Sequence, residues 1–431
     1  MKPVLGWLKS NVLLVIFGLL AVVPLPVAYV VAGGMNTSLV EERQQSASSL
    51  LSRLRSERVT YELPPMTPGE EPVSVTSPPN SVTTAFFQAE RARREAQLER
   101  IKEAATERNR RGREPLVDGL FPQPAAMDSQ LKLNEMARRA VAEGTPESAY
   151  EALFRRLRIR PPVDGAELGV RLAAQRDGKI AQITGDQGAG ALTPEQLEQL
   201  DQEMWRFRIG EYRAHAQDTA FYGDTQLLPA TVPVSVAASP PTLETAFAWQ
   251  WDYWVIEDVL TALANANAAL DGSGVGGAAL GGVVKRVDSV LLEPAPIGVV
   301  GGSDGGRRGG RNGSDGPAGP VTLTGRAPGE SAQYDIRYAD VSLVAASAKL
   351  PALFDALASS NLITVLDTDL SAVDPWTDLG QGLYYGDDAV VRVDLRLELL
   401  YLRSWTAQWM PPAVREALGV ADPAEDDNGL G

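Results

Sequence analysis

Three aspartates near residue 370 are the residues of this sequence that are best spaced for metal chemistry. Asp367, Asp369 and Asp374 follow a predicted strand, and closely spaced carboxylates are the ligands that Ca²⁺ and Mg²⁺ prefer. A calcium-binding loop also needs a central glycine and a distal glutamate at fixed positions, and this spacing supplies neither. We therefore interpret these residues as loop and helix-capping aspartates, and the sequence predicts no metal site.

A glycine-rich stretch, Gly274-Val-Gly276-Gly277-Ala-Ala279, matches the letters of a dinucleotide-binding fingerprint. That fingerprint binds a pyrophosphate only where a strand precedes it and a helix follows it. Here a predicted helix precedes the stretch and a predicted strand follows it. We interpret it as a glycine-rich helix exit, and we expect no cofactor.

Nucleophilic and thiol chemistry have few candidate residues in this chain. There is no cysteine, which excludes thiol catalysis, disulfides and cysteine-ligated metals. His215 is the single histidine, so a multi-histidine metal site is excluded and a Ser-His-Asp triad would depend on this residue. We expect no catalytic, cofactor-binding or metal-binding residue and no enzyme activity. An exported hydrolase that uses carboxylates is the alternative from the enzyme class.

The charge of the chain argues against nucleic acid as a partner. The formal net charge is −15 at pH 7, and an acidic chain repels the phosphate backbone. One basic cluster, Arg-Asn-Arg-Arg-Gly-Arg at residues 108–113, stands out against this background. We interpret it as the solvated end of a charged helix rather than as a nucleic-acid or lipid contact.

The N-terminal residues have the length and composition of a membrane helix. Val12–Ala32 is almost entirely apolar, about the 20 residues that span a bilayer core. Lys2 and Lys9 precede this run, and Glu41 and Glu42 follow it. By the positive-inside rule, the N-terminus stays in the cytoplasm and the rest of the chain is exported.

A cleaved signal peptide, cut after Ala32, is the alternative interpretation of this segment. In the residues that follow, Val40, Ala47, Leu54 and Tyr61 recur every seven positions. This weak heptad is compatible with a short coiled coil, and an amphipathic juxtamembrane helix explains it equally well. A proline-rich stretch then predicts an extended linker.

The middle of the chain reads as helical. A charged helix is expected over about residues 84–111, and Thr193-Pro194-Glu195-Gln196 is the start of another helix. The threonine and glutamine of that motif form a capping box, with proline at the first helical position.

The C-terminal part alternates helices and strands. A long amphipathic helix begins near Thr242, and we expect its tryptophans to pack in a core. The further elements expected are strands over Val283–Leu292 and Tyr334–Ala345, a helix over Lys349–Ser359, and strands over Asn361–Leu370 and Val390–Leu402. A change of apolar phase near Ala339–Asp340 predicts a β-bulge in the second strand. This αββαββ order predicts two helices on one face of a four-stranded antiparallel sheet, a circularly permuted ferredoxin-like arrangement.

The fold class expected is therefore α+β, with an N-terminal transmembrane helix and a helical or coiled-coil stalk before the ferredoxin-like domain. The predicted segments are a cytoplasmic stub (1–10), a transmembrane helix (11–33), a juxtamembrane helix (34–63), a proline-rich linker (64–83), a helical region (84–228), a ferredoxin-like domain (242–403) with a glycine-rich disordered insert (298–320), and an acidic tail (404–431).

This order of segments resembles the PilO/GspM-like bitopic proteins, alignment-complex components of type IV pilus and type II secretion machines. The resemblance rests on the helix Leu350-Pro-Ala-Leu-Phe-Asp-Ala-Leu357 feeding the strand Asn361–Leu370, and it covers roughly residues 1–60 and 242–403. The proline-rich linker, the helical region and the glycine-rich insert depart from the family pattern.

The resemblance implies a non-catalytic scaffold in the cell inner membrane, single-pass, with its bulk in the periplasm. It implies a homo- or heterodimer through the C-terminal domain and stalk, and contacts with other inner-membrane components of a pilus or secretion machine. The alternative is an exported, membrane-anchored binding module that recognises a ligand or cell-surface protein through the tryptophan-rich helix and the sheet face.

Overall fold

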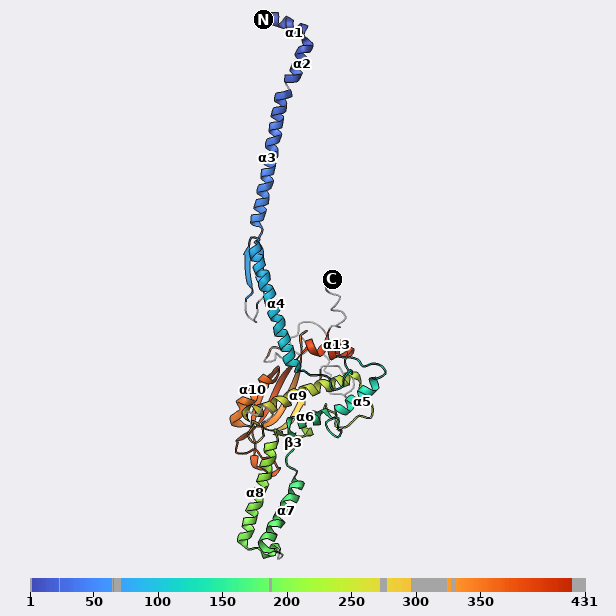
Figure 1. Ribbon diagram of the computed structural model, residues 1–431, viewed down its shortest axis with the longest axis vertical. Helices are drawn as coiled ribbons and strands as arrows, with labels where there is room; N and C mark the ends of the chain where they lie inside the picture. The colour runs from blue at the N-terminus through green and yellow to red at the C-terminus, as the bar shows by residue number, and fades with distance from the viewer. Residues whose placement is uncertain are drawn as a thin grey trace, which may run out of the picture. The chain divides into compact units, whose positions relative to one another are not determined.

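The computed structural model describes residues 2–22, 24–63, 65, 71–185, 188–271, 277–295, 324–326 and 331–420. The chain divides into two compact units, Met1–Glu103 and Ala104–Gly431. It combines helices with β-sheet, which confirms the mixed fold class, and many of its helices are labelled in Figure 1. The glycine-rich insert at 298–320 lies outside the described residues.

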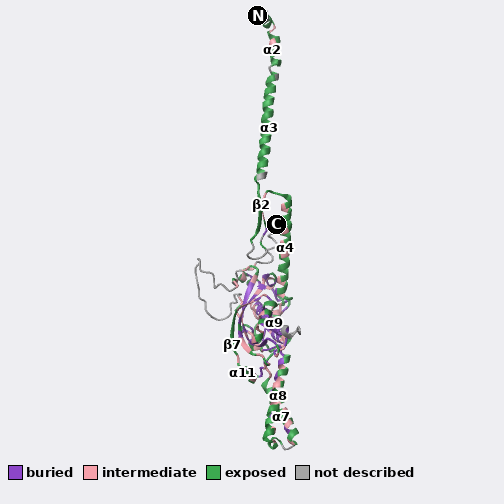
Figure 2. Cartoon of the chain, turned by 90° about the vertical axis from the view of Figure 1, so that its left-hand side faces the viewer, coloured by how far each residue is buried: buried purple, intermediate pink, exposed green. Residues whose placement is uncertain are grey.

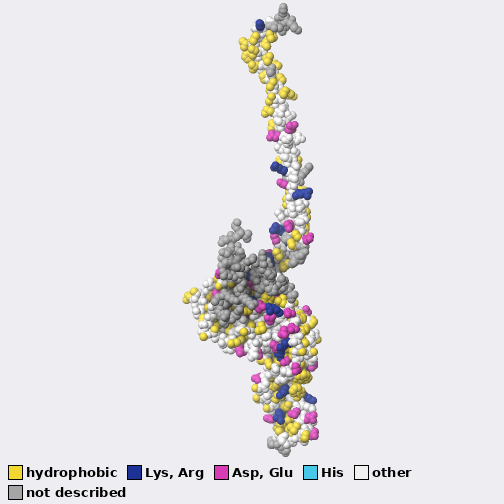
Figure 3. All heavy atoms as spheres, turned by 180° about the vertical axis from the view of Figure 1, so that it is seen from behind, with side chains coloured by type: hydrophobic (Ala, Val, Ile, Leu, Met, Phe, Trp, Pro, Cys, Tyr) yellow, Lys and Arg dark blue, Asp and Glu magenta, His cyan; other side chains and the backbone are white. Residues whose placement is uncertain are grey.

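The first unit begins with three helices, α1 (Lys2–Ser10), α2 (Val12–Val22) and α3 (Pro24–Ser56). By length and composition, one helical stretch among the described residues can cross a membrane, over Val12–Arg53, and the most apolar part of it is not buried. Figure 3 shows the apolar side chains gathered over α2 and the start of α3, with charged side chains beyond them.

A β-hairpin follows α3, which corrects the boundaries predicted for the juxtamembrane helix (34–63) and the proline-rich linker (64–83). The helix ends at Ser56, and β1 (Val59–Leu63) pairs antiparallel with β2 (Val73–Ser77). Alternating Val and Thr residues favour strands. Pro72 and Pro78 flank β2 instead of interrupting its hydrogen bonds.

The hairpin packs on the next helix, α4 (Ser81–Arg110). The Tyr61 ring stacks on Phe87 with 5.1 Å between centroids, and its hydroxyl lies 2.9 Å from Thr84 Oγ1. Tyr61, the last position of the predicted heptad, therefore belongs to a strand, and only the earlier heptad positions lie in α3.

The second unit contains a six-stranded sheet with the order β3-β4-β5-β6-β8-β7. Its strands are β3 (Ile159–Arg160), β4 (Phe221–Tyr222), β5 (Val284–Leu292), β6 (Tyr334–Ala346), β7 (Ile363–Ala372) and β8 (Val390–Leu402). The four long strands are antiparallel, while β3 and β4 add in parallel beside β5. The two short strands lie in the region predicted as helical (84–228); the sequence did not indicate them, because two-residue strands leave no periodic pattern.

The helices of this unit are α5 (Ser129–Arg139), α6 (Ala149–Leu157), α7 (Gly165–Thr184), α8 (Pro194–Asp218), α9 (Leu243–Asp271), α10 (Leu350–Ser360), α11 (Pro375–Gly380), α12 (Arg403–Thr406) and α13 (Pro412–Leu418). Short 3₁₀ turns are η2 (Ala189–Ala191), η3 (Thr225–Leu227), η4 (Ser347–Lys349) and η5 (Ala407–Trp409). The predicted capping box at Thr193 and Gln196 is present and begins α8.

Helix α9 packs beside α10 against the sheet, and both helices carry core residues, drawn purple in Figure 2. Trp251 and Trp254 are buried, which confirms their expected place in the core. The helix is buried around most of its circumference, so it has less exposed polar surface than the predicted amphipathic helix would have. Its buried polar residues are Gln250, Asp252, Asp258 and Asn267.

The β-bulge predicted in β6 near Ala339–Asp340 is wrong. The pairing of β6 with β8 runs without a shift, and the irregularities lie in the pairing of β5 with β6. The pattern misled because two charged residues of β6 lie on the core face, where Asp335 is bonded to Arg403 and Arg337 to Asp252. In the sequence, these buried charged residues therefore look like a change in the phase of the apolar alternation.

The acidic tail predicted at 404–431 is also corrected over its first part. Residues 404–420 fold into α12, η5 and α13, and Trp405, Met410 and Val414 are buried in the main core. Pro412 begins α13, where a proline's missing N–H costs nothing. Residues 421–431 lie outside the described residues.

Gly282 provides a sharp test of this packing. An added Cβ would overlap the buried Asn267 amide, which bonds Ala220 O at 2.7 Å and both backbone polar groups of Val284 at 2.8 Å. We expect Gly282→Ala to destabilise the fold by about 1–3 kcal/mol, as overpacking does, measured by urea unfolding.

The matched control is Gly210→Ala in α8, where an added Cβ meets nothing within 4 Å. There the same substitution should stabilise the helix by roughly 0.5–1 kcal/mol. Equal effects of the two substitutions would contradict the packing described for Asn267.

Candidate functional site

The end of α4 enters the core of the second unit. Two successive residues in left-handed conformation, Arg111 (φ 54°) and Gly112 (φ 66°), follow the helix. The Arg111 N–H donates to Glu107 O at 2.8 Å, and the Arg113 N–H donates to Arg110 O at 3.0 Å. These bonds end the helix and satisfy part of its free carbonyls, so that residues 108–113 lie against α9, the end of α10 and β8.

Asn109 is the most completely bonded residue of this region. It is fully buried, and its Nδ2 donates to Asn361 Oδ1 at 3.0 Å and to Leu400 O at 2.8 Å. Its Oδ1 accepts from Leu402 N at 2.8 Å and from Trp405 Nε1 at 2.7 Å. The amide thus uses both donors and both acceptor positions, and it joins α4 to the strand end of β8 and to α12.

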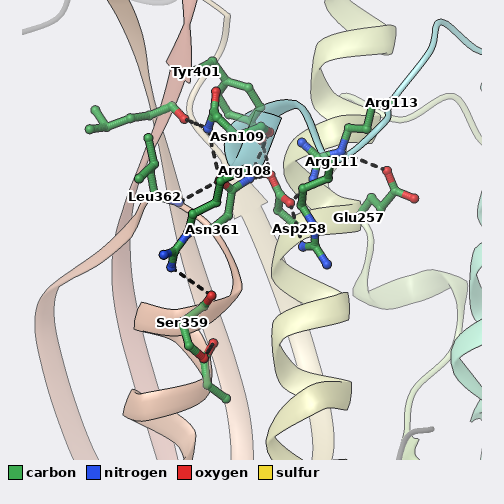
Figure 4. A network of polar contacts seen from close by, with 12 residues as sticks. Arg108, Asn109, Arg111, Arg113, Glu257, Asp258, Ser359, Asn361, Leu362 and Tyr401 are labelled. Carbon is green, nitrogen blue, oxygen red and sulfur yellow. Dashed lines mark hydrogen bonds and ion pairs between the residues drawn. The ribbon is translucent and has the colours of Figure 1, made fainter. Parts of the chain in front are cut away.

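Asp258 of α9 is the charged centre of the same network, shown in Figure 4. Its Oδ2 accepts from Asn361 Nδ2 at 2.9 Å and from the Tyr401 hydroxyl at 3.0 Å. Its Oδ1 accepts from Arg113 Nη2 and, at 3.4 Å, from Arg111 Nη1. A buried carboxylate with four donors is compensated for its loss of hydration.

The rim of the network ties down neighbouring helices. Glu257 forms ion pairs with Arg113 at 3.4 Å and with Arg156 of α6 at 2.6 Å. Arg108 Nη2 donates to Ser359 O at 3.0 Å at the C-terminal end of α10, where a cation also favours the helix dipole. Helices α4, α6, α9 and α10 are therefore joined around residues 108–113.

Burial governs the electrostatics of this network. It lowers the pKa of Arg113 from its usual value, and Glu257 opposes that shift. Burial likewise raises the pKa of the Tyr401 hydroxyl well above its ordinary value. Tyr401 is therefore a neutral donor to Asp258 at every physiological pH. The arrangement fixes elements in place, and its donors are directed at protein acceptors rather than at a substrate.

The aspartates considered as metal ligands lie in two different places. Asp374 caps α11 by accepting from Trp376 N at 3.0 Å, which confirms the capping role, whereas Asp367 and Asp369 lie within β7 rather than in a loop. Within the described part of the chain, no group of three or more His, Asp or Glu side chains is placed to hold a metal ion.

The other candidates of the sequence have packing roles. His215 Nε2 lies 2.9 Å from Pro161 O, and its ring stacks near Tyr222. Ala279 is buried and its N–H donates to Thr219 O at 2.8 Å. Gly274 and Gly276 of the glycine-rich stretch lie outside the described residues.

The basic cluster at 108–113 was misinterpreted as a solvated helix end. Asn109 and Arg113 are buried. One local signal pointed to this site: an asparagine followed by Gly112 at a helix end is typical of a cap. The partners Asp258 and Asn361 could not be predicted, because they lie far away along the chain.

These features define a chain of mixed helix and sheet with one long apolar N-terminal helix and, within its second unit, a polar network around residues 108–113. No family model matches the chain, and no curated protein matches it significantly. A solved crystal structure from Akkermansia muciniphila is similar over 64% of this chain and 96% of that chain, at 12% identity and a TM-score of 0.24. A likeness this low carries no argument about fold or function.

Proposed function

We propose that this chain is a non-catalytic, membrane-anchored scaffold of a cell-envelope machine, of the kind that aligns type IV pilus or type II secretion assemblies. Its apolar N-terminal helix serves as the anchor, its N-terminus is cytoplasmic, and its second unit lies in the periplasm. The chemistry of the α4 end supports this proposal, because its polar groups are engaged in holding secondary structure together.

The observation that carries the proposal is the complete bonding of Asn109. Helix α4 is the covalent link between the anchor-bearing part of the chain and the second unit. A linker that only tethers needs no buried bonds at its end. The last turn of α4 is instead bonded to α9, α10 and β8, as expected where a tether must not pull free of the domain.

Two further features support the finer proposal. The segment from α9 to β8 has the order αββαββ, and its long strands lie antiparallel in the order β5-β6-β8-β7, as a circularly permuted ferredoxin-like unit requires. The exposed α3 retains Val40, Ala47 and Leu54 on heptad spacing, which favours pairing with another helix. We propose dimerisation through both parts.

The anchor and its orientation are tested by membrane fractionation. We expect the full chain to stay in the membrane pellet after carbonate extraction. We also expect a protease to digest the second unit only when the protease is added from the periplasmic side. A soluble mature protein that begins at Gly33 would instead show cleavage after Ala32 and would contradict the anchor.

The scaffold role is tested by crosslinking the full chain in its native membrane. We expect homo- or heterodimers and co-purification of inner-membrane pilus or secretion components. A strict monomer without such partners would count against the proposal.

The alternative function is a membrane-anchored binding module, and one surface favours it. Trp205 of α8 and Trp376 of α11 are 51% and 76% exposed and line one hollow of about 460 Å³ with Tyr384. Trp251 and Trp254 of α9, in contrast, are buried, so neither ring is open to a ligand. Loss of ligand binding in Trp376→Ala with folding retained would favour this alternative.

A further inference from the structure

The face of the sheet opposite α9 carries an unusual arrangement of charge. On β8, the alternate residues Val393, Leu395 and Leu397 belong to the core. The residues between them, Asp394 and Arg396, line a shallow hollow of about 380 Å³ on the other face. We call this hollow the acidic face. Its charged residues are Asp340, Asp367, Asp369, Asp394 and Arg396.

The acidic face contains carboxylates that the described part of the chain leaves uncompensated. Asp369 lies directly opposite Asp394 in the pairing of β7 with β8, and like charges at such positions destabilise a sheet. Within the described residues neither carboxylate forms an ion pair, while Arg396 is shared between Asp340 and Glu293. Four carboxylates therefore face a single guanidinium that already has partners.

The acidic face continues to an open strand edge. Among the strands that the structure describes, β7 is last in the sheet and pairs with β8 alone. Its residues from Asp367 to Ala372 are all exposed, as the green β7 in Figure 2 shows. Such an edge can accept an added strand through backbone hydrogen bonds.

The charges on β7 select what can pair with that edge. Asp367 and Asp369 are two residues apart, and they lie opposite Arg396 and Asp394 on one face of the sheet. They repel the same strand of a second copy. Side chains of an extended partner repeat with the same period of two, so basic residues at alternate positions would meet these carboxylates.

The same face of β8 already binds one arginine. Arg326 Nη1 donates to Glu398 Oε1 at 2.8 Å, and Thr324 Oγ1 donates to Glu398 Oε2 at 2.8 Å. Glu398 lies two residues beyond Arg396 and is completely buried by these contacts and its neighbours. Arginine binding to a carboxylate of this sheet face is therefore part of the structure.

We infer that β7 and the acidic face bind an extended partner segment that carries Lys or Arg at every second position. The segment adds to the open edge of β7, and its basic side chains neutralise Asp367, Asp369 and Asp394. The identity of this partner as a machine component rests on the proposed scaffold function, whereas the binding itself rests on the geometry of the sheet.

The test uses the full chain in detergent micelles and two fluorescent peptides of identical composition. One peptide alternates Lys and Thr, and the other has its lysines in one block. Fluorescence anisotropy should show the alternating peptide binding at least ten-fold more tightly, with affinity falling as salt is raised. The double variant Asp369→Asn and Asp394→Asn should lower that affinity at least ten-fold, and Asp355→Asn on α10 should leave it unchanged.

Equal affinity of the wild-type chain for the two peptides would overturn the inference, and this measurement needs no variant. So would a loss of peptide affinity in Asp355→Asn as large as that in the double variant. A ten-fold gain in peptide affinity after replacing Arg307, Arg308 and Arg311 by Gln would make the chain's own arginines the occupant and refute a partner. A dimer that the alternating peptide dissociates would make a second copy the occupant. Membrane fractionation is independent of all these outcomes, so failure here leaves the anchor proposal standing.

Discussion

Asp258→Ala should destabilise the second unit by about 3–5 kcal/mol, the effect of removing one partner from a buried ion pair. The substitution leaves the Arg113 guanidinium, whose side chain is 7% exposed, with Glu257 at 3.4 Å as its remaining charged partner. It also removes the acceptor of Asn361 and Tyr401. Urea unfolding of the full chain in detergent, followed by tryptophan fluorescence, measures this loss as a lower midpoint at unchanged slope.

Two further variants make this prediction specific. Asp258→Asn keeps an acceptor for Tyr401 but loses the charge, so its stability should lie between those of the wild type and Asp258→Ala. Asp355→Ala removes an exposed carboxylate from α10 and should change stability by less than about 0.5 kcal/mol. Asp258→Ala within that same range would mean that the network contributes nothing to the attachment of α4.

The elements that local periodicity dictates could be predicted from the sequence. Strand β8 has the predicted bounds, Val390–Leu402, because apolar residues alternate with charged ones over Val391–Leu399, most of its length. The capping box of α8 is equally local, since Thr193 and Gln196 are three residues apart. Such signals depend on neighbouring residues alone.

The candidate site could not be predicted because it is built from distant residues. Asn109 and its partner Asn361 are 252 positions apart, and Arg113 and Asp258 are 145 apart. The identity of a polar residue does not show whether it is buried in such a network or exposed to solvent. The sequence therefore assigned Asn109 to a surface, although burial with full hydrogen bonding is its actual state.

Strand β6 shows the same limit within one element. Arg337 donates through Nη2 to Asp252 Oδ1 at 2.6 Å and to Glu293 O at 3.0 Å, and its guanidinium lies 5.2 Å from the Trp251 ring centre. A charged residue at a core position looks like a solvent-facing one in the sequence. This ambiguity produced the false β-bulge, and only the α9 partner resolves it.

The strength of that buried pair gives the second large expected effect. Arg337→Met should destabilise the fold by about 3–5 kcal/mol, because it leaves the carboxylate of Asp252, whose side chain is 6% exposed, without its cation. Adding Asp252→Asn removes the stranded charge. The double variant should then be more stable than the sum of the single effects implies, by about 1–3 kcal/mol, as measured by urea unfolding of all four proteins.

An arginine-to-methionine substitution on the other face of the sheet serves as the control, because the arginine there is paired but exposed. Arg392 of β8 is 43% exposed and forms an ion pair with Asp288 at 3.3 Å, so Arg392→Met should cost at most about 1 kcal/mol. Additive effects of Arg337→Met and Asp252→Asn would show that the two charges do not depend on each other. Coupling, in contrast, would establish that β6 is held to α9 by a charged pair within the core, where sequence alone indicates a bulge.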